Sequence, residues 1–373
     1  MRGGVHLIGS VPLHDTEEVL RTLSSGLGDQ LRRLPDGETG ARALFAGWQV
    51  ATFRRHPDFE PARRLGTIPG VRPHRVRSGV DRDRISFSEL GFASAARDSY
   101  RVFSRLRQEG TIQAGVKFQV SLPTAVNCLA MILAKEDLPA IEPAYERALL
   151  SEIDEIATAI PAEDLCIQWD VPWEVRAWDR SMPRLLPEPW FPDVRGGILE
   201  RLTRLGSRVP AGAELGYHLC HGDYEHVGRL ILGLRHRRGG RLARRAVSRL
   251  LRKVSVRVAG PLRDMRSVTE LADALVRSAS RRIDFIHFPV PRSADDAYFA
   301  PLAGYRPPAG LEIYLGLIHV SDGLAGAHRR IQSARLVLPR FGVATECGWG
   351  RREPDTIPGL IELHRSLGQA VSP

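Results

Sequence analysis

The stretch 214-ELGYHLC-220 is a short apolar run that ends in a histidine and a cysteine. If it forms a β-strand, alternate side chains point to one side, so His218 and Cys220 project in the same direction. Comparable runs, bounded by Gly, Pro or Asp, recur along the chain, which is the pattern of short buried strands. They occupy residues 5–10, 31–36, 115–121, 165–170, 214–220, 284–290, 312–319 and 341–347.

Apolar residues at helical spacing follow most of these runs, as in Ile331, Ala334 and Val337. Eight strands alternating with helices in 373 residues predict a single (β/α)8 TIM barrel over residues 1–373. The alternative is a doubly wound open sheet, but no G-x-G-x-x-G motif follows the first run. The barrel would carry a long loop over 61–92 after its second strand and a basic insertion at 234–258 after its fifth. Long loops on the active-site face often cover the substrate.

Polar and metal-binding residue types stand at the carboxyl ends of the predicted strands. In a TIM barrel these ends line the active-site face, so such residues indicate binding or catalysis. The simpler explanation, that loops are polar anyway, accounts for serine and aspartate better than for histidine and cysteine. In chain order the strand ends hold Ser10, Asp36 with Glu38, Ser121, Asp170, His218 with Cys220, His287, His319 with Asp322, and Cys347.

His218, Cys220 and Cys347 predict a zinc site. Zinc favours imidazole and thiolate ligands, and a catalytic zinc keeps one coordination position open. The alternative is that both cysteines are small buried apolar residues and that His218 is a hydrogen-bonded core histidine. Because metal-binding residue types converge on one end of the barrel, we favour zinc.

Five motifs resemble the catalytic barrel of cobalamin-independent methionine synthase, in the same order and over nearly the whole chain. They are 8-IGSVP-12, 36-DGE-38, 167-IQWDVP-172, 218-HLC-220 and 346-ECG-348. That barrel belongs to a superfamily with uroporphyrinogen decarboxylase and is also similar to the zinc enzymes that alkylate coenzyme M.

The resemblance implies a zinc-dependent transferase that activates a substrate thiol as a zinc-bound thiolate for attack on a methyl or other alkyl carbon. One alternative is a thiol or alkyl transferase like epoxyalkane:coenzyme M transferase. Another, from a different class, is a metal-free, decarboxylase-like lyase acting on a polycarboxylate, which the basic charge would suit.

The resemblance also assigns metal ligands. In the family, the His and Cys of H-x-C, a Glu on the next strand and a Cys before a Gly bind zinc, so His218, Cys220 and Cys347 match three of them. Gapless matching places Pro289 where the family has the Glu. His287, two residues earlier on the same strand face, is either a substitute ligand or a hydrogen-bond donor to a carboxylate. Water or substrate could also hold the fourth position.

The family places its thiol amino acid against residues that correspond to Ser10, Glu38 and Asp170. Carboxylates at a barrel mouth can hold an ammonium group, and the backbone N–H groups at Ser10 suit a carboxylate. Trp169 and Val171 flank Asp170 where the synthase has smaller or acidic residues, which indicates a different substrate pocket.

Two of the candidate residues, Asp36 and Asp170, also have a simpler structural explanation. A turn role for Asp36 and a helix-cap role for Asp170 remain open alternatives. The candidate substrate-binding residues are Ser10, Asp36, Glu38, Ser121 and Asp170, and the candidate catalytic residues are Glu38, Asp170 and His319.

The chain is basic, with a formal net charge of +10, yet its 43% of hydrophobic residues and its regular periodicity indicate a globular protein. A dense basic stretch covers 234–253. It could contact an acidic protein or another anionic partner, although a solvated, arginine-rich segment is the simpler explanation. No aromatic residue interrupts it, which disfavours nucleic acid as a partner.

Cysteine usage and the N-terminus point to the cytoplasm. The four cysteines, two of them assigned to zinc, imply no disulfide framework and fit a reducing compartment. We recognise no signal peptide at the start of the sequence and no apolar stretch near membrane-spanning length. The expected partners are a small-molecule thiol and an alkyl donor.

Overall fold

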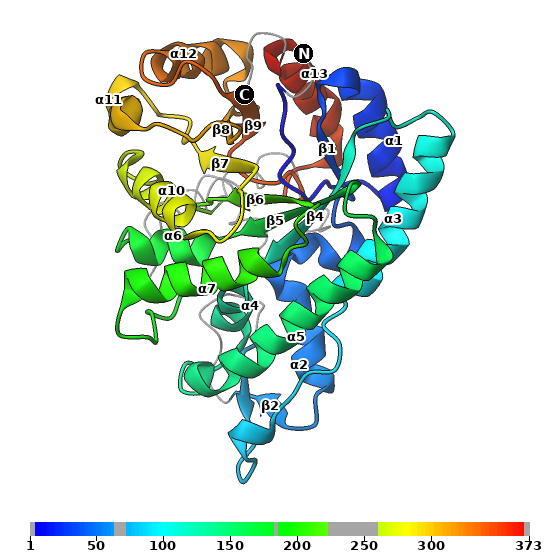
Figure 1. Cartoon of the computed structure of the whole chain (residues 1–373), viewed down its shortest axis with the longest axis vertical. Coiled ribbons are helices and arrows are strands. Elements are labelled where there is room, and N and C mark those ends of the chain that lie inside the picture. Colours follow the sequence, from blue (N-terminus) through cyan, green and yellow to red (C-terminus); the bar gives the residue numbers. More distant parts are fainter. Residues whose placement is uncertain (1–3, 63–71, 183–185, 223–259, 369–373) are drawn as a thin grey trace, which may run out of the picture.

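A computed structural model of the chain describes residues 4–62, 72–182, 186–222 and 260–368 (Figure 1). The described residues contain a seven-stranded, wholly parallel sheet with the order β1-β4-β5-β6-β7-β8-β9. Its strands are β1 (Arg33–Pro35), β4 (Lys117–Pro123), β5 (Leu165–Asp170), β6 (Glu214–His218), β7 (Phe285–Pro289), β8 (Glu312–Ile318) and β9 (Gly342–Thr345).

Helices alternate with these strands and surround the sheet (Figure 1). Most α-helices contact the next α-helix along the outside, and α13 returns to α1, so the helices form an outer layer around the strands. In the described parts of the chain, no helix is both long and apolar enough to cross a membrane. The α-helices are α1 (Thr16–Leu27), α2 (Val50–Arg55), α3 (Phe92–Gln108), α4 (Ala125–Ile132), α5 (Leu138–Ala159), α6 (Pro172–Trp178), α7 (Val194–Arg208), α10 (Arg266–Ser278), α11 (Asp296–Phe299), α12 (Gly323–Arg335) and α13 (Ile357–Gly368). Short 3₁₀ segments are Gly28–Gln30, Gly40–Gln49, Arg82–Arg84, Ala300–Gly304 and Pro354–Thr356.

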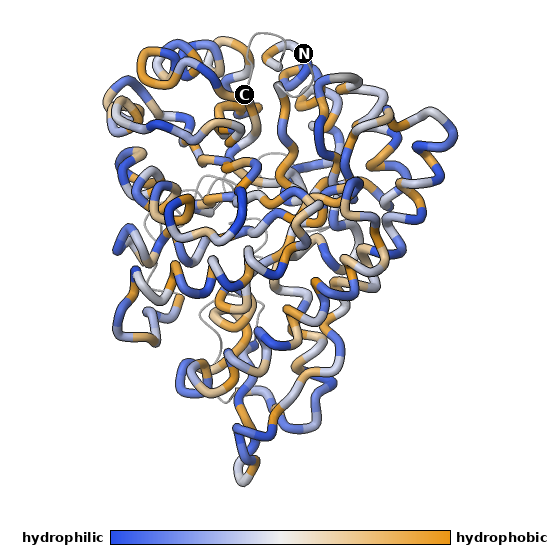
Figure 2. The backbone as a smooth tube through the Cα atoms, in the orientation of Figure 1, coloured by the Kyte–Doolittle hydropathy of each residue, from blue (hydrophilic) through white to orange (hydrophobic). Residues whose placement is uncertain are grey.

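Local sequence signals start several of these helices. Asp15 accepts a hydrogen bond from the Glu18 N–H at the start of α1, and Asp193 caps α7 in the same way. Apolar side chains pack between the helices and the strands, and Figure 2 shows orange stretches in the central strands with mixed colouring along the helices. Burial of one apolar face per helix against the sheet therefore holds the two layers together.

The segment predicted as the first strand, 5–10, is not a regular strand, which corrects the expectation of a closed eight-stranded barrel. Val5 forms single parallel bridges to Leu31 and to Val343, so the segment lies between the two edges of the sheet. Beyond this point, the Leu7 and Ile8 carbonyls accept hydrogen bonds from the side chains of residues 119, 121 and 168. A carbonyl engaged by these side chains does not extend a strand ladder. The sheet is thus a curled, TIM-like half-barrel.

The long loop predicted after the second strand contains structure of its own. Short strands β2 (Phe59–Pro61) and β3 (His74–Val76) pair antiparallel, and Asp137 at the start of α5 accepts a hydrogen bond from the Val76 N–H at 2.9 Å. In Figure 1 the hairpin lies at one end of the molecule, beyond α2 and α5. The sequence pattern missed it because each strand has three residues, too few for a recognisable alternation.

The basic insertion at 234–258, including the candidate partner site at 234–253, lies outside the described residues. On either side of the gap, the buried Arg176 in α6 donates through Nη2 to the carbonyls of His221, at 2.6 Å, and Gly260, at 2.7 Å. The chain therefore leaves and rejoins the described structure at one place.

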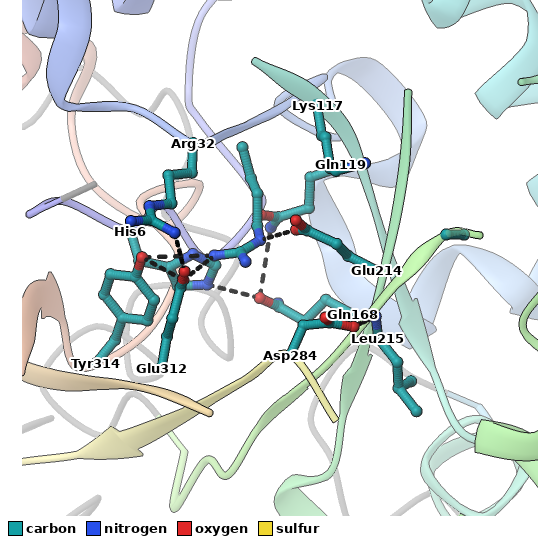
Figure 3. A network of polar contacts seen from close by, with 12 residues as sticks. His6, Arg32, Lys117, Gln119, Gln168, Glu214, Leu215, Asp284, Glu312 and Tyr314 are labelled. Atoms are coloured by element: carbon teal, nitrogen blue, oxygen red, sulfur yellow. Dashed lines mark hydrogen bonds and ion pairs between the residues drawn. The ribbon is translucent and has the colours of Figure 1, made fainter. Parts of the chain in front are cut away.

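A buried polar network lies where the strands begin (Figure 3). Arg33 donates to Glu214 at 2.5 Å and to Glu312 at 2.8 Å, and its guanidinium lies 4.2 Å from the centre of the Phe285 ring. Tyr314 adds a hydrogen bond to Glu312 at 2.9 Å. These contacts tie β1, β6 and β8 together at the end of the sheet opposite the predicted site.

Candidate metal centre

The carboxyl ends of β6, β7 and β9 bring the metal-binding residue types together. In the parallel register, Asp170 of β5 pairs with His218 of β6 and His218 with His287 of β7, so these three residues lie at one level near the strand ends. Cys220 follows β6, and Cys347 follows β9 after one intervening residue. The distant histidine and cysteine motifs of the sequence thus meet at one end of the curled sheet.

His218, Cys220 and Cys347 form a group whose potential ligand atoms all lie within 4.8 Å of one another. His218 and Cys220 are buried and Cys347 is partly buried. The two Sγ atoms are 3.7 Å apart. Two thiolates bound tetrahedrally to one zinc at about 2.3 Å would be about 3.8 Å apart, so the sulfur spacing fits this metal.

A buried nitrogen of His218 that has no hydrogen-bond partner in the described part of the chain also fits a metal-binding role. Among the described residues, the His218 Nε2 atom has no hydrogen-bond partner although it is shielded from solvent. Buried polar atoms are normally paired, so an unpaired one needs an explanation. A metal ligand role supplies one. One imidazole and two thiolates then leave the fourth tetrahedral position for water or substrate.

Each of the two sulfur atoms accepts a hydrogen bond from a residue outside the group. Arg351 Nη2 donates to Cys347 Sγ at 3.0 Å, and the Gly222 N–H donates to Cys220 Sγ at 3.2 Å. Although burial opposes ionisation, the hydrogen bond from Cys220 and the charge of Arg351 lower the pKa of Cys347 well below its usual value. The same contact and burial raise the pKa of Cys220, so Cys347 ionises first.

The loop that carries Cys347 is anchored from both sides. Thr345 Oγ1 donates to the Cys347 carbonyl at 2.7 Å and accepts from Trp349 Nε1 at 3.0 Å. Ser10 accepts from the Trp349 N–H through its carbonyl and from the Gly350 N–H through Oγ. A Cβ on Gly348 would lie 2.4 Å from Ser10 Oγ, so glycine permits this approach. The candidate substrate residue Ser10 thus also positions the metal-ligand loop.

Asp36 and Ser121 are engaged by the protein. Asp36 accepts from the Glu38 N–H at 2.9 Å and from Arg42 and Ser99 at 2.7 Å each, which matches the turn role left open for it. Burial opposes ionisation, but Arg42 outweighs it and lowers the pKa of Asp36. Ser121 donates to the Ile8 carbonyl at 2.8 Å. Their part in substrate binding stays a prediction.

Glu38 and Asp170 are carboxyl groups whose pKa values are raised. Burial, and then the charge of Asp36, raise the pKa of Glu38 to about 8. Burial, and then Glu38, raise the pKa of Asp170 well above its usual value. Cys347 adds to both shifts and Arg351 opposes both, so the two carboxyl groups lie close enough to the candidate ligand Cys347 to respond to its charge.

Backbone geometry also marks Glu38. It has φ of 46° and follows Gly37 with φ of 84°, so two successive residues lie in the left-handed region. A non-glycine residue there costs roughly 1 kcal/mol, and such strain is concentrated at functional sites. Glu38 also packs on Gly9, where an added Cβ would lie 2.2 Å from Glu38 Oε1.

Asp170 does not act as a helix cap in the structure. The residue before α6 is Val171, which offers no side-chain cap, and the Trp173 N–H in the first turn donates to Asn127 Oδ1 at 3.1 Å. Asp170 instead accepts a hydrogen bond from Gln168 Nε2 at 2.8 Å. The open alternative of a capping role is therefore wrong.

His287 and His319 lie outside the three-residue group. His287 Nδ1 is 2.8 Å from His218 Nδ1, so His287 contacts a candidate ligand. His319 Nε2 donates to the Val290 carbonyl at 2.9 Å, and its Nδ1 is 3.8 Å from Glu346. Burial, and then Arg330, lower the pKa of His319 to about 3, so it is neutral at physiological pH.

Sequence reasoning missed Arg351 and Gln168. Gln168 is part of the motif 167-IQWDVP-172, but nothing in a glutamine within a strand distinguishes a functional residue from a core amide. Arg351 follows Cys347 by four residues in a chain with 53 lysines and arginines, so its residue type is not a distinguishing signal.

The fold is similar to the crystal structure of a candidate vitamin-B12-independent methionine synthase from Listeria monocytogenes. The TM-score is 0.50 at 13% sequence identity, and the match covers 97% of this chain and 95% of that one. At this identity the likeness shows the fold alone. No protein-family model and no curated protein matches the sequence.

The raised pKa of Glu38 predicts a specific pH dependence of stability. Between its unfolded value of 4.5 and about 8, folded Glu38 holds a proton that the unfolded chain has released, so the free energy of unfolding falls as pH rises. One proton corresponds to at most about 1.4 kcal/mol per pH unit, less where solvent reaches the group. We expect Glu38→Gln to flatten this slope between pH 5 and 8, measured by denaturant unfolding of the metal-free protein.

Asp170 titrates in the same direction, so the slope of Glu38→Gln should be reduced and not abolished. Glu155→Gln, at an exposed position of α5, serves as the control for exchanging a carboxyl group for an amide. Identical slopes for the wild type and Glu38→Gln would contradict a proton held on Glu38.

Proposed function

We propose that this protein is a zinc-dependent transferase that moves a methyl or other alkyl group onto the sulfur of a small thiol. The observation that carries the proposal is the convergence of His218, Cys220 and Cys347 on one point at the strand ends. The methionine-synthase-like fold supports a transferase of this kind. Zinc bound there would lower the pKa of a ligating thiol and so supply a thiolate nucleophile near neutral pH.

The surrounding residues of the chain would prepare the site for such a substrate. Arg351 stabilises the ionised form of Cys347, which is the form that binds a metal. Glu38 and Asp170 share a partly buried space in which two negative charges disfavour each other. An ammonium group on the thiol would relieve this repulsion, so we propose an amino thiol as the substrate.

The direct test is metal analysis followed by a transfer assay. We expect one zinc per chain, and cobalt in its place should change its visible spectrum when homocysteine is added. The matched thiol 4-mercaptobutanoate lacks only the ammonium group and should bind roughly 10- to 100-fold more weakly, because the carboxyl groups lose their partner. A methylated folate and an epoxide, supplied separately, distinguish methyl transfer from alkylation by ring opening.

Two results would contradict the proposal. Protein purified without metal, and unable to take up zinc, would remove its basis and favour the metal-free lyase. Equal binding of the two thiols, with zinc present, would leave the transferase in place but exclude the proposed role of the carboxyl pair.

A further inference from the structure

A chain of two histidines connects the candidate ligand His218 to the backbone of the Cys347 loop. His218 Nδ1 lies 2.8 Å from His287 Nδ1, and His287 Nε2 lies 3.1 Å from the Thr345 carbonyl oxygen. Both rings are buried, His287 completely. The contact therefore runs from β6 through β7 to the end of β9, across the interior of the curled sheet.

The Thr345 carbonyl, at the end of this series of hydrogen bonds, determines which atoms donate and which accept. A carbonyl oxygen only accepts, so the Thr345 contact requires a proton on His287 Nε2. A neutral His287 then has a lone pair on Nδ1, which accepts from a proton on His218 Nδ1. His218 is left with its lone pair on Nε2, the atom without a partner among the described residues.

We infer that His287 is a positioning residue that fixes the tautomer and the ring orientation of His218, so that His218 presents Nε2 to the two cysteines. This role differs from metal ligation, because His287 does not belong to the group of ligand atoms within 4.8 Å. The 2.8 Å contact between the two Nδ1 atoms holds one proton, so one ring donates it and the other accepts it. A ligand histidine is normally held through its second nitrogen in this way.

The Thr345 carbonyl is placed by a distortion of the sheet. The pairing of β8 with β9 shifts register between Leu315 and Ile318, so the two strands are out of step at Gly316. A Cβ on Gly316 would lie 2.7 Å from the Glu346 Cα and 3.1 Å from the Thr345 oxygen. The glycine thus allows the backbone before Cys347 to approach β8, and His287 ties this backbone to His218.

The inference rests on the proposed function only for the identity of the metal, and its first test needs no metal. In metal-free protein with nitrogen-15-labelled histidine, we expect His218 to carry its proton on Nδ1 and His287 on Nε2. In His287→Phe, which keeps a ring of similar size but no hydrogen bond, the His218 proton should no longer be confined to Nδ1. Finding the His218 proton on Nε2 in the wild type would overturn the inference.

The second test measures zinc affinity by competition with a chelator. His287→Phe should weaken zinc binding roughly 10- to 100-fold. His287→Asn places an amide oxygen near the position of Nδ1, so it should stay within a few-fold of the wild type. His74→Phe, at a buried histidine in β3, is the matched control and should bind zinc like the wild type.

Variants are compared only where their circular dichroism and unfolding midpoints match the wild type, so that a folding defect is not read as a loss of zinc. Wild-type affinity in His287→Phe would overturn the inference, and so would equal weakening in the Phe and Asn variants. If the wild type shows the expected tautomers but takes up no zinc, the histidine chain stands and the proposed function fails.

Discussion

Replacing Cys347 with serine is expected to remove most of the zinc bound at the proposed site and, with it, the proposed transfer activity. Zinc binding of about 10–16 kcal/mol, divided evenly among three protein ligands, is about 3–5 kcal/mol for each, so the loss of one thiolate should weaken affinity at least a hundredfold. The serine hydroxyl does not ionise as the thiol does, so Arg351, which donates to Cys347 Sγ at 3.0 Å, would face a neutral oxygen in place of a thiolate. The measurement is zinc per chain after dialysis against a weak chelator, followed by the thiol transfer assay.

Cys166→Ala provides the matched control. Cys166 is buried in β5 beside Phe285 and Tyr314, and it does not belong to the group of candidate metal ligands. Burial raises the pKa of its thiol, so it contributes no thiolate. This variant should retain one zinc per chain. Cys347→Ser protein that still holds one zinc with wild-type affinity would show that the metal, if any, is bound elsewhere.

Replacing Arg33 with alanine is expected to lower the free energy of unfolding more than any other substitution proposed for this protein. The Arg33 side chain is 2% exposed and forms ion pairs with Glu214 and Glu312, which are 21% and 14% exposed. Removing one partner of a buried ion pair leaves uncompensated charge and typically costs about 3–5 kcal/mol. The measurement is the free energy of unfolding in urea at neutral pH.

Arg32→Ala is the matched control, since Arg32 is the adjacent residue, pairs with the same Glu312, and is 44% exposed (Figure 3). An exposed pair contributes about 0–1 kcal/mol, so this variant should be almost as stable as the wild type. If Arg33→Ala does not fold, the triple variant Arg33→Met, Glu214→Gln, Glu312→Gln should fold, because it leaves no buried charge without a partner and Arg32 is 44% exposed. Equal effects at Arg32 and Arg33 would contradict a buried network.

Most strands could be located from residue pattern because their physical cause is local. Short apolar runs bounded by Gly, Pro and Asp are typical of buried strands, and seven predicted runs overlap β1 and β4 to β9. The run at 5–10 has the same pattern but is not a regular strand, because residues 119, 121 and 168 compete for its carbonyls. That competition involves side chains more than 100 positions away and has no local signal.

The candidate site divides in the same way. The i, i+2 spacing of His218 and Cys220 on a strand indicates by itself that both project in one direction. The approach of Cys347, by contrast, depends on the parallel register of the strands and on the Ser10 contacts to its loop. The two open roles of His287 could not be separated in the sequence, because ligation and hydrogen bonding require the same residue type on the same face.

What the sequence determined by itself is therefore the strand and helix pattern, the residue types at the strand ends and the pairing of His218 with Cys220. These depend on periodicity and on the geometry of a single strand. The tertiary structure decided the meeting of the three candidate ligands, the raised pKa values of Glu38 and Asp170, and the contacts of Arg351 and His287 with the centre. The reason is physical: distance, burial and charge between residues remote in the chain exist only after the strands have packed side by side.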